Sequence, residues 1–155
     1  NQRLENWLVD KGIRIDVARS VNFEKEKCEP NKVLKKAKFI MQNLDEKEFL
    51  NVITLFKRAN NILKNNSTNC QINEKLFVKK EEKELFEYVK TFEFATYAEF
   101  MKKCLDGKIL IHNFFENVMV MDENIDIRNN RLKILEILVQ NVLNFADLSE
   151  VVVGE

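Results

Sequence analysis

Glycine and proline are scarce in this chain of 155 residues, which contains three glycines and one proline. Because these two residue types are the usual interruptions of helices, their scarcity favours long helices joined by short connections. No segment shows the sustained alternation of apolar and polar residues that is typical of a half-buried strand. We therefore predict an all-α fold, a bundle of about six to eight helices.

The chain also lacks the residues of a metal site or a membrane segment. Its cysteines, Cys28, Cys70 and Cys104, are far apart and form no Cys-x-x-Cys pair, and the single His112 cannot complete a usual zinc site. Three unpaired thiols indicate a reducing, cytoplasmic setting, and no apolar run approaches membrane-spanning length. Because the chain begins at Asn1 and enters a helical pattern at once, we expect it to be a piece of a longer protein.

Catalytic motifs are missing as well. The sequence has no glycine-rich phosphate loop, no nucleophile motif and no carboxylate matched to a base. We predict no catalytic site and no cofactor in this fragment. The acidic residues between 81 and 87 are expected to form a solvated helix face, and the run Val118-Met119-Val120-Met121 to pack in the core.

Charge excludes one class of partner and leaves room for another. Twenty-five basic residues balance twenty-five acidic ones, so a surface that grips DNA or RNA everywhere is excluded and only a local patch remains. Residues 49–73 form the candidate patch, since they contain Lys57, Arg58, Lys64 and seven asparagines but no acid.

Residues 45–65 are predicted to form one helix, in which Thr54, Arg58 and Asn61 share the face opposite Phe49 and Phe56. A row of arginine, asparagine and threonine with a lysine margin suits an RNA loop, because lysines bind phosphates while arginine and asparagine pair with exposed base edges. The alternative is an ordinary amphipathic helix whose polar face is basic. Asn60 falls inside the apolar stripe, where a hydrogen bond to a neighbouring helix is the simpler role.

Other helices are predicted from periodicity and from capping residues. They cover residues 1–11, 16–23, 30–43, 81–92, 97–107 and 109–120, and a long apolar helix follows over 123–148. Asp45 and Asp122 are the expected N-caps of the helices that follow them, and Gly107 is an expected helix end. We divide the chain into a helical lead-in segment, residues 1–45, and a helical domain, residues 46–155.

Three segments carry a resemblance to a known family. Residues 114–132 place Phe-Phe, a Val-Met-Val-Met run and Arg-x-Asn-Arg-Leu in one order. Residues 57–63 read Lys-Arg-Ala-Asn-Asn-Ile-Leu, and residues 146–149 read Ala-Asp-Leu-Ser. Together they resemble the C-terminal anticodon-binding domain of the beta subunit of bacterial glycyl-tRNA synthetase. At position 112 the family usually has an acidic residue, and we expect His112 to be a partly exposed structural residue.

The resemblance implies a helical domain of the type shared with arginyl-tRNA synthetase, which binds the anticodon of glycine tRNA. ATP would be used at the alpha subunit, and the partners would be the tRNA, the alpha subunit and the rest of the beta subunit, with no DNA and no membrane. The candidate tRNA-binding residues are Lys57, Arg58, Asn61, Lys64, Arg128 and Arg131.

For two of these residues, Arg131 and Arg128, a contact within the protein is an alternative to RNA binding. Arg131 precedes a very apolar segment and is suited to holding carbonyl groups or a carboxylate across the bundle. Arg128 lies where the helix dipole disfavours a cation, so its partner is either RNA phosphate or an acid such as Glu116 or Asp122. For the whole domain, the rival function is a helical module that docks onto other parts of the synthetase without touching the anticodon.

Overall fold

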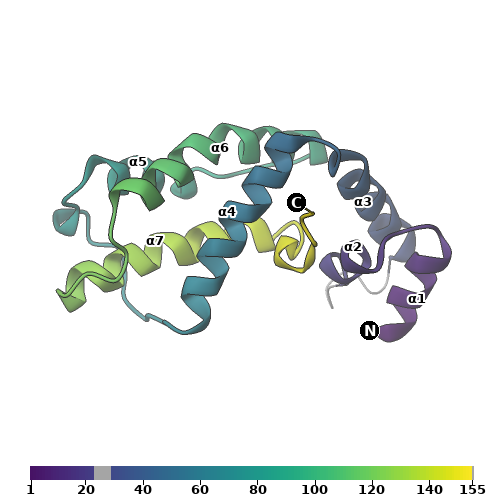
Figure 1. Cartoon of the computed structure of the whole chain (residues 1–155), viewed down its shortest axis with the longest axis horizontal. Helices are drawn as coiled ribbons and strands as arrows, with labels where there is room; N and C mark the ends of the chain where they lie inside the picture. Colours follow the sequence, from purple (N-terminus) through teal and green to yellow (C-terminus); the bar gives the residue numbers. More distant parts are fainter. Residues whose placement is uncertain (23–28, 155) are drawn as a thin grey trace.

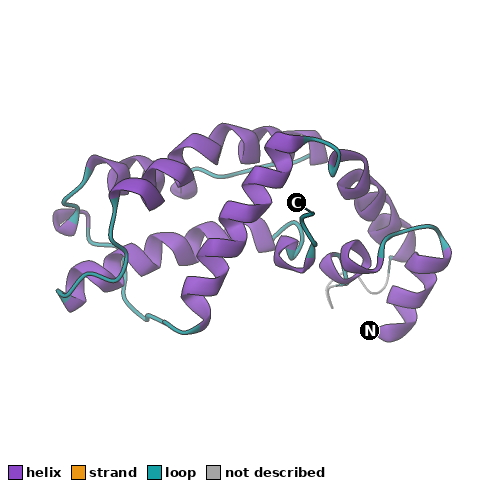
Figure 2. Ribbon diagram, viewed as in Figure 1, coloured by secondary structure: helices purple, strands orange, loops and turns teal. Residues whose placement is uncertain are grey.

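In the computed structural model, which describes residues 1–22 and 29–154, the chain forms seven α-helices and, in those two ranges, no strand (Figures 1 and 2). This confirms the predicted all-α class. The α-helices are α1 (Gln2–Asp10), α2 (Ile15–Ser20), α3 (Pro30–Asn43), α4 (Lys47–Lys64), α5 (Lys80–Lys90), α6 (Tyr97–Asn117) and α7 (Ile125–Leu143). Two short 3-10 helices complete the fold, η2 (Glu74–Leu76) and η3 (Leu148–Glu150).

Helices α4 to α7 pack as a bundle in which α4 and α5 each contact both α6 and α7. Figure 1 shows α4 crossing between α6 and α7. The centre is apolar and aromatic, with Phe49, Phe56, Phe100, Phe114 and Phe145 fully buried. Burial of such rings is the main driving force for this packing, because apolar area removed from water stabilises the folded chain.

Helices α1 to α3 continue this core rather than forming a separate one. Helix α2 contacts η3, and the backbone N–H of Asp147 donates to the carbonyl of Ser20 at 2.8 Å. Lys36 of α3 is buried and donates to the carbonyl of Phe145 at 2.7 Å. The division at residues 45 and 46 stays a prediction.

Helices α3 and α4 begin and end close to their predicted positions, but the caps differ. The N-cap of α4 is Glu46, without a side-chain capping bond, so the predicted role of Asp45 is wrong. The last helix begins after Asn124, whose side-chain oxygen accepts from the N–H groups of Asp126 and Ile127. Asp122 instead accepts from the N–H of Asn124, which places it one turn before the helix.

Gly107 does not end a helix, contrary to the prediction, because α6 runs without a break from Tyr97 to Asn117. The reason lies in packing. A Cβ atom on Gly107 would overlap the phenol ring of Tyr88 on α5. The glycine therefore allows close contact between two helices, whereas Gly12 has a φ of 91° and ends α1 as predicted.

Candidate nucleic-acid interface

The polar face of α4 is open to solvent. Thr54, Arg58 and Asn61 are exposed, on the side of the helix opposite the buried Phe49 and Phe56. The spacing of three and four residues places each side chain about one turn from the next, which gives a continuous row. We call this row, Thr54, Arg58 and Asn61, the polar strip.

The basic margin of the polar strip is only partly exposed. Lys64 is exposed at the end of α4, whereas Lys57 is half-buried, as is Asn60. No acidic residue lies between Phe49 and Asn73, so this segment carries only positive side-chain charges although the chain as a whole is neutral. Four of the predicted site residues, Lys57, Arg58, Asn61 and Lys64, thus lie together on one helix.

Arg58 is held by an aromatic ring rather than by a carboxylate. Its guanidinium carbon lies 4.4 Å from the centroid of the Phe115 ring of α6. Within the described residues, neither Arg58 nor Asn61 makes a hydrogen bond or an ion pair. The stacked guanidinium keeps its N–H donors available while its plane is fixed by the cation–π contact.

A groove of about 550 Å³ begins beside Arg58. Its lining is mainly apolar, with Arg58, Glu116 and Asn117 as polar members, and includes Ile62, Phe115, Val118, Met119, Val120 and Met121. Met119 is 71% exposed and Met121 45% exposed, so the prediction that the Val-Met run packs in the core is wrong for the methionines. The chain leaves α6 at Val118 with an extended backbone, and in this segment the valines alternate inward and the methionines outward.

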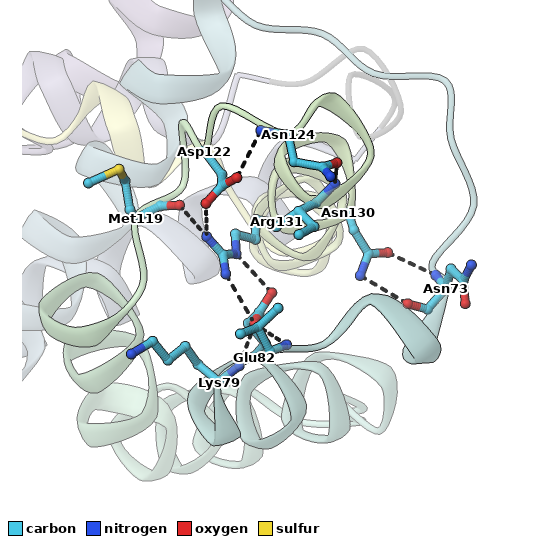
Figure 3. Close-up of polar contacts among 10 residues, drawn as sticks. Asn73, Lys79, Glu82, Met119, Asp122, Asn124, Asn130 and Arg131 are labelled. Atoms are coloured by element: carbon cyan, nitrogen blue, oxygen red, sulfur yellow. Dashed lines mark hydrogen bonds and ion pairs between the residues drawn. The ribbon is translucent and has the colours of Figure 1, made fainter.

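Arg131 holds a carbonyl group and carboxylates across the bundle, which is the structural alternative considered for it from the sequence. The side chain is only 4% exposed, and its guanidinium donates to Glu82 at 2.9 Å, to the Met119 carbonyl at 2.7 Å and to Asp122 at 3.3 Å (Figure 3). A buried cation of this kind needs such partners, because desolvation would otherwise be costly. Arg131 therefore lies inside the bundle, with its guanidinium bonded to groups of the protein itself.

Glu82 is the acidic side of this contact and was missed by sequence reasoning. It was expected on a solvated face, yet it is fully buried, and its second oxygen accepts from the N–H groups of Val78 and Lys79 at 2.8 Å each. It therefore satisfies free donors at the start of α5 while it neutralises Arg131. Glu81 is buried as well, and the repeated glutamates of this segment give no signal that separates these two from the exposed Glu84 and Glu87.

Asn130 of the same motif is also internal. Its amide exchanges two hydrogen bonds with the backbone of Asn73, at 2.8 and 3.0 Å, and it is 1% exposed (Figure 3). This pair fixes the end of the polar loop that follows α4. The Arg-x-Asn-Arg motif, on which the resemblance partly rests, thus holds loops in place.

Arg128 belongs neither to the polar strip nor to the buried pair Asn130 and Arg131. It is half-buried in the first turn of α7, and neither acid that was considered as its partner binds it in the structure, since Asp122 is paired with Arg131. Glu116 makes no ion pair or hydrogen bond with any residue that the structure describes. Within residues 1–22 and 29–154, Arg128 makes no hydrogen bond or ion pair with the polar strip.

A second groove of about 670 Å³ lies between α4 and α6. It shares Thr54 with the polar strip and includes Leu105, Ile109 and His112, all exposed. His112 was expected to be a partly exposed structural residue; it is exposed, and its structural role stays a prediction. In residues 1–22 and 29–154 no group of three or more potential ligands is arranged to hold a metal ion.

The buried thiol of Cys104 is unsuited to act as a nucleophile. Burial raises the pKa of Cys104 to about 12, so the thiol stays protonated.

Over the described residues, none of the helices is long and apolar enough to cross a membrane.

Comparisons with known proteins agree with the sequence resemblance. The chain is 34% identical, over 96% of its length, to the glycine–tRNA ligase beta subunit of Halothermothrix orenii. It is 31% identical over 99% of its length to that of Aquifex aeolicus, and 32% identical over 98% to that of a Sulfurihydrogenibium species. The chain spans only 23%, 23% and 24% of the length of these relatives. No protein-family model matches it.

Proposed function

Because the chain belongs to the family of the glycine–tRNA ligase beta subunit, we propose that it binds the anticodon loop of glycine tRNA through the polar strip of α4. The bond-making steps, with their ATP, would belong to the alpha subunit, and this chain would hold no cofactor. The tRNA, the alpha subunit and the rest of the beta subunit would be its partners, in the cytoplasm.

One observation carries the proposal: Arg58 and Asn61 are exposed and make no hydrogen bond or ion pair in the described chain, on a helix face without acids. Exposed cations and amides with unused hydrogen-bonding capacity are what an unpaired RNA loop needs, since its bases offer open pairing edges. Lys64 would contact phosphate, with the half-buried Lys57 beside it. A neutral molecule in which residues 49–73 carry positive charges and no acid fits a local contact rather than a general affinity for nucleic acid.

We expect Arg58→Ala, in the full synthetase, to raise the KM for glycine tRNA by about 5- to 150-fold, the range of one good base contact. ATP-dependent glycine activation should keep its rate, because that step precedes the tRNA. The two rates are measured by aminoacylation and by pyrophosphate exchange. Lys102→Ala is the matched control, since Lys102 is exposed and ion-paired with Asp106 on α6. An equal loss in both rates would exclude the anticodon role.

The groove between α4 and α6 favours a second function, docking onto another part of the synthetase. Ile109 is 58% exposed there beside the exposed Leu105, an apolar surface that is commonly covered in assemblies. Under this alternative Ile109→Glu would weaken the association of the subunits and leave tRNA affinity per assembled enzyme unchanged. Analytical ultracentrifugation and filter binding on the same samples separate the two functions.

A further inference from the structure

The groove beside Arg58 has the chemistry to distinguish one pyrimidine from the other. Its polar lining contains a cation, Arg58, and a carboxylate, Glu116, which has no partner in the described chain. We propose that this groove takes one unpaired cytosine, with Glu116 as a specificity-determining residue. The inference rests on the proposed function, since it requires that the polar strip meets an RNA loop.

The pairing edge of cytosine matches these two side chains. Cytosine presents an exocyclic amine as donor, and a ring nitrogen and a carbonyl oxygen as acceptors. A carboxylate accepts from the amine, as acidic side chains do in base readout, and a guanidinium donates to the two acceptors. Uracil places a carbonyl oxygen where cytosine has its amine, so Glu116 would repel it. Specificity then comes from an unfavourable contact as well as a favourable one.

The apolar lining suits the faces of a base. Phe115 packs against the Arg58 guanidinium from α6, which fixes the plane in which its N–H donors meet the base edge. Met119 and Met121 are exposed on the neighbouring segment, and their thioethers are polarizable groups that pack against aromatic rings. The volume of about 550 Å³ lies within the usual range of about 300–1,000 Å³ for ligand sites.

Met119 and Met121 form one wall of the groove, and Arg131 holds the segment that carries them. This wall is therefore already ordered in the free protein. Arg131 donates to the Met119 carbonyl at 2.7 Å and to Asp122 at 3.3 Å (Figure 3). Met119 and Asp122 precede and follow Met121 in the sequence. A wall that is already ordered loses little conformational entropy on binding. Arg131 thus acts as a positioning residue for the groove while remaining buried.

Glycine codons begin with two guanines, so the second and third anticodon bases of a glycine tRNA are cytosines, and each can be tested. The probes are glycine tRNAs with cytosine, uracil or the fluorescent analogue pyrrolocytosine at either position, bound to the full synthetase. The variants are Glu116→Ala and the double variant Met119→Ala, Met121→Ala, with Glu123→Ala as control, an exposed acid outside the groove lining. All these side chains are exposed, so the variants are expected to fold.

We expect Glu116→Ala to lower the preference for cytosine over uracil by about 5- to 150-fold, at one of the two positions only. The methionine variant should weaken binding of both bases at that position and remove the change in pyrrolocytosine fluorescence. Glu123→Ala should alter neither readout.

An unchanged cytosine preference in Glu116→Ala would overturn the inference, and so would loss of subunit association, instead of tRNA binding, in the methionine variant. If Arg58→Ala still raises the KM for tRNA in either case, the proposed anticodon function stands and only the groove assignment fails. If Arg58→Ala has no effect either, both are wrong.

Discussion

Single residues set the distances between elements in this bundle, and Gly107 is the clearest case. It lies in the middle of α6, where a glycine normally weakens a helix by about 1 kcal/mol relative to alanine. The missing side chain makes room for the Tyr88 ring, whose hydroxyl donates to the carbonyl of Lys103 and whose ring packs against Phe92. Desolvation raises the pKa of Tyr88 well above its usual range, so the hydroxyl remains a donor.

We predict that Gly107→Ala lowers the free energy of unfolding by about 1–3 kcal/mol, because the added methyl group displaces the Tyr88 ring and breaks its hydrogen bond. In a Tyr88→Ala background the same substitution should stabilise the protein by up to about 1 kcal/mol, the gain in helix propensity. Urea unfolding of the four proteins measures both effects. A loss of equal size in both backgrounds would show that the ring is not the cause.

At the scale of the elements, loops rather than helices depend on buried polar contacts. Arg131 links α7 to the start of α5 through Glu82 and to the segment after α6 through Met119 and Asp122. Asn130 links α7 to the loop after α4 through the backbone of Asn73. One turn of α7 therefore fixes the positions of three segments: the loop after α4, the start of α5 and the segment after α6. Apolar packing alone would not fix them.

We predict that Arg131→Met destabilises the protein by about 3–5 kcal/mol, since the buried Glu82 side chain would lose its cationic partner. Lys133→Met is the control on the same helix, because Lys133 forms a partly exposed ion pair with Glu136 and should cost about 0–1 kcal/mol. Thermal and urea unfolding would give both values. A small loss for Arg131→Met would mean that the ion pair is replaceable by apolar packing.

Periodicity and capping rules predicted the helices unequally well, for physical reasons. The bounds of α3 and α4 followed from strong apolar stripes bounded by Pro30 and by a polar loop. The break at Gly107 was wrong because a glycine required by a neighbouring ring looks the same in sequence as one that ends a helix.

The candidate site was predictable only where it depends on one helix. Exposure of Arg58 and Asn61 follows from the helical period, since it is a local property. The contacts of Arg58 with Phe115, and of Arg131 with Glu82, join segments 57 and 49 residues apart, which no local pattern encodes. The outward methionines were missed because an apolar run is ambiguous between a core segment and an extended surface segment.

For the whole molecule, the start of α2 meets the last described residues of the chain. Asp16 of α2 accepts from Arg14 at 2.6 Å and from the backbone N–H of Val152 at 2.7 Å. Burial alone raises the pKa of Asp16, but the hydrogen bonds from Arg14 and Val152 outweigh it and hold the pKa below the usual 3.8. The carboxylate joins the first helices to the last residues, so its charge supports the closure of the fold.

A depressed pKa in the folded state gives stability that is fully present above the unfolded pKa of about 3.8 and is lost as the pH falls through the folded value. We therefore predict that Asp16→Asn is less stable than the parent near neutral pH and that the difference shrinks below about pH 4. Urea unfolding at a series of pH values tests this, with the exposed Asp10→Asn as the charge control. A difference that is independent of pH would refute the prediction.

The burial of Asn130 and Arg131 has a consequence for how such domains diverge. Within the segments by which this chain is recognised, Asn130 and Arg131 preserve scaffold geometry, whereas Arg58 and Glu116, which would choose the ligand under the proposed function, lie in solvent. A descendant could exchange those two surface residues and adopt a different codon assignment while Asn130 and Arg131 stayed in place. Shared ancestry, read from the two buried residues, would then report the architecture and remain silent on the ligand.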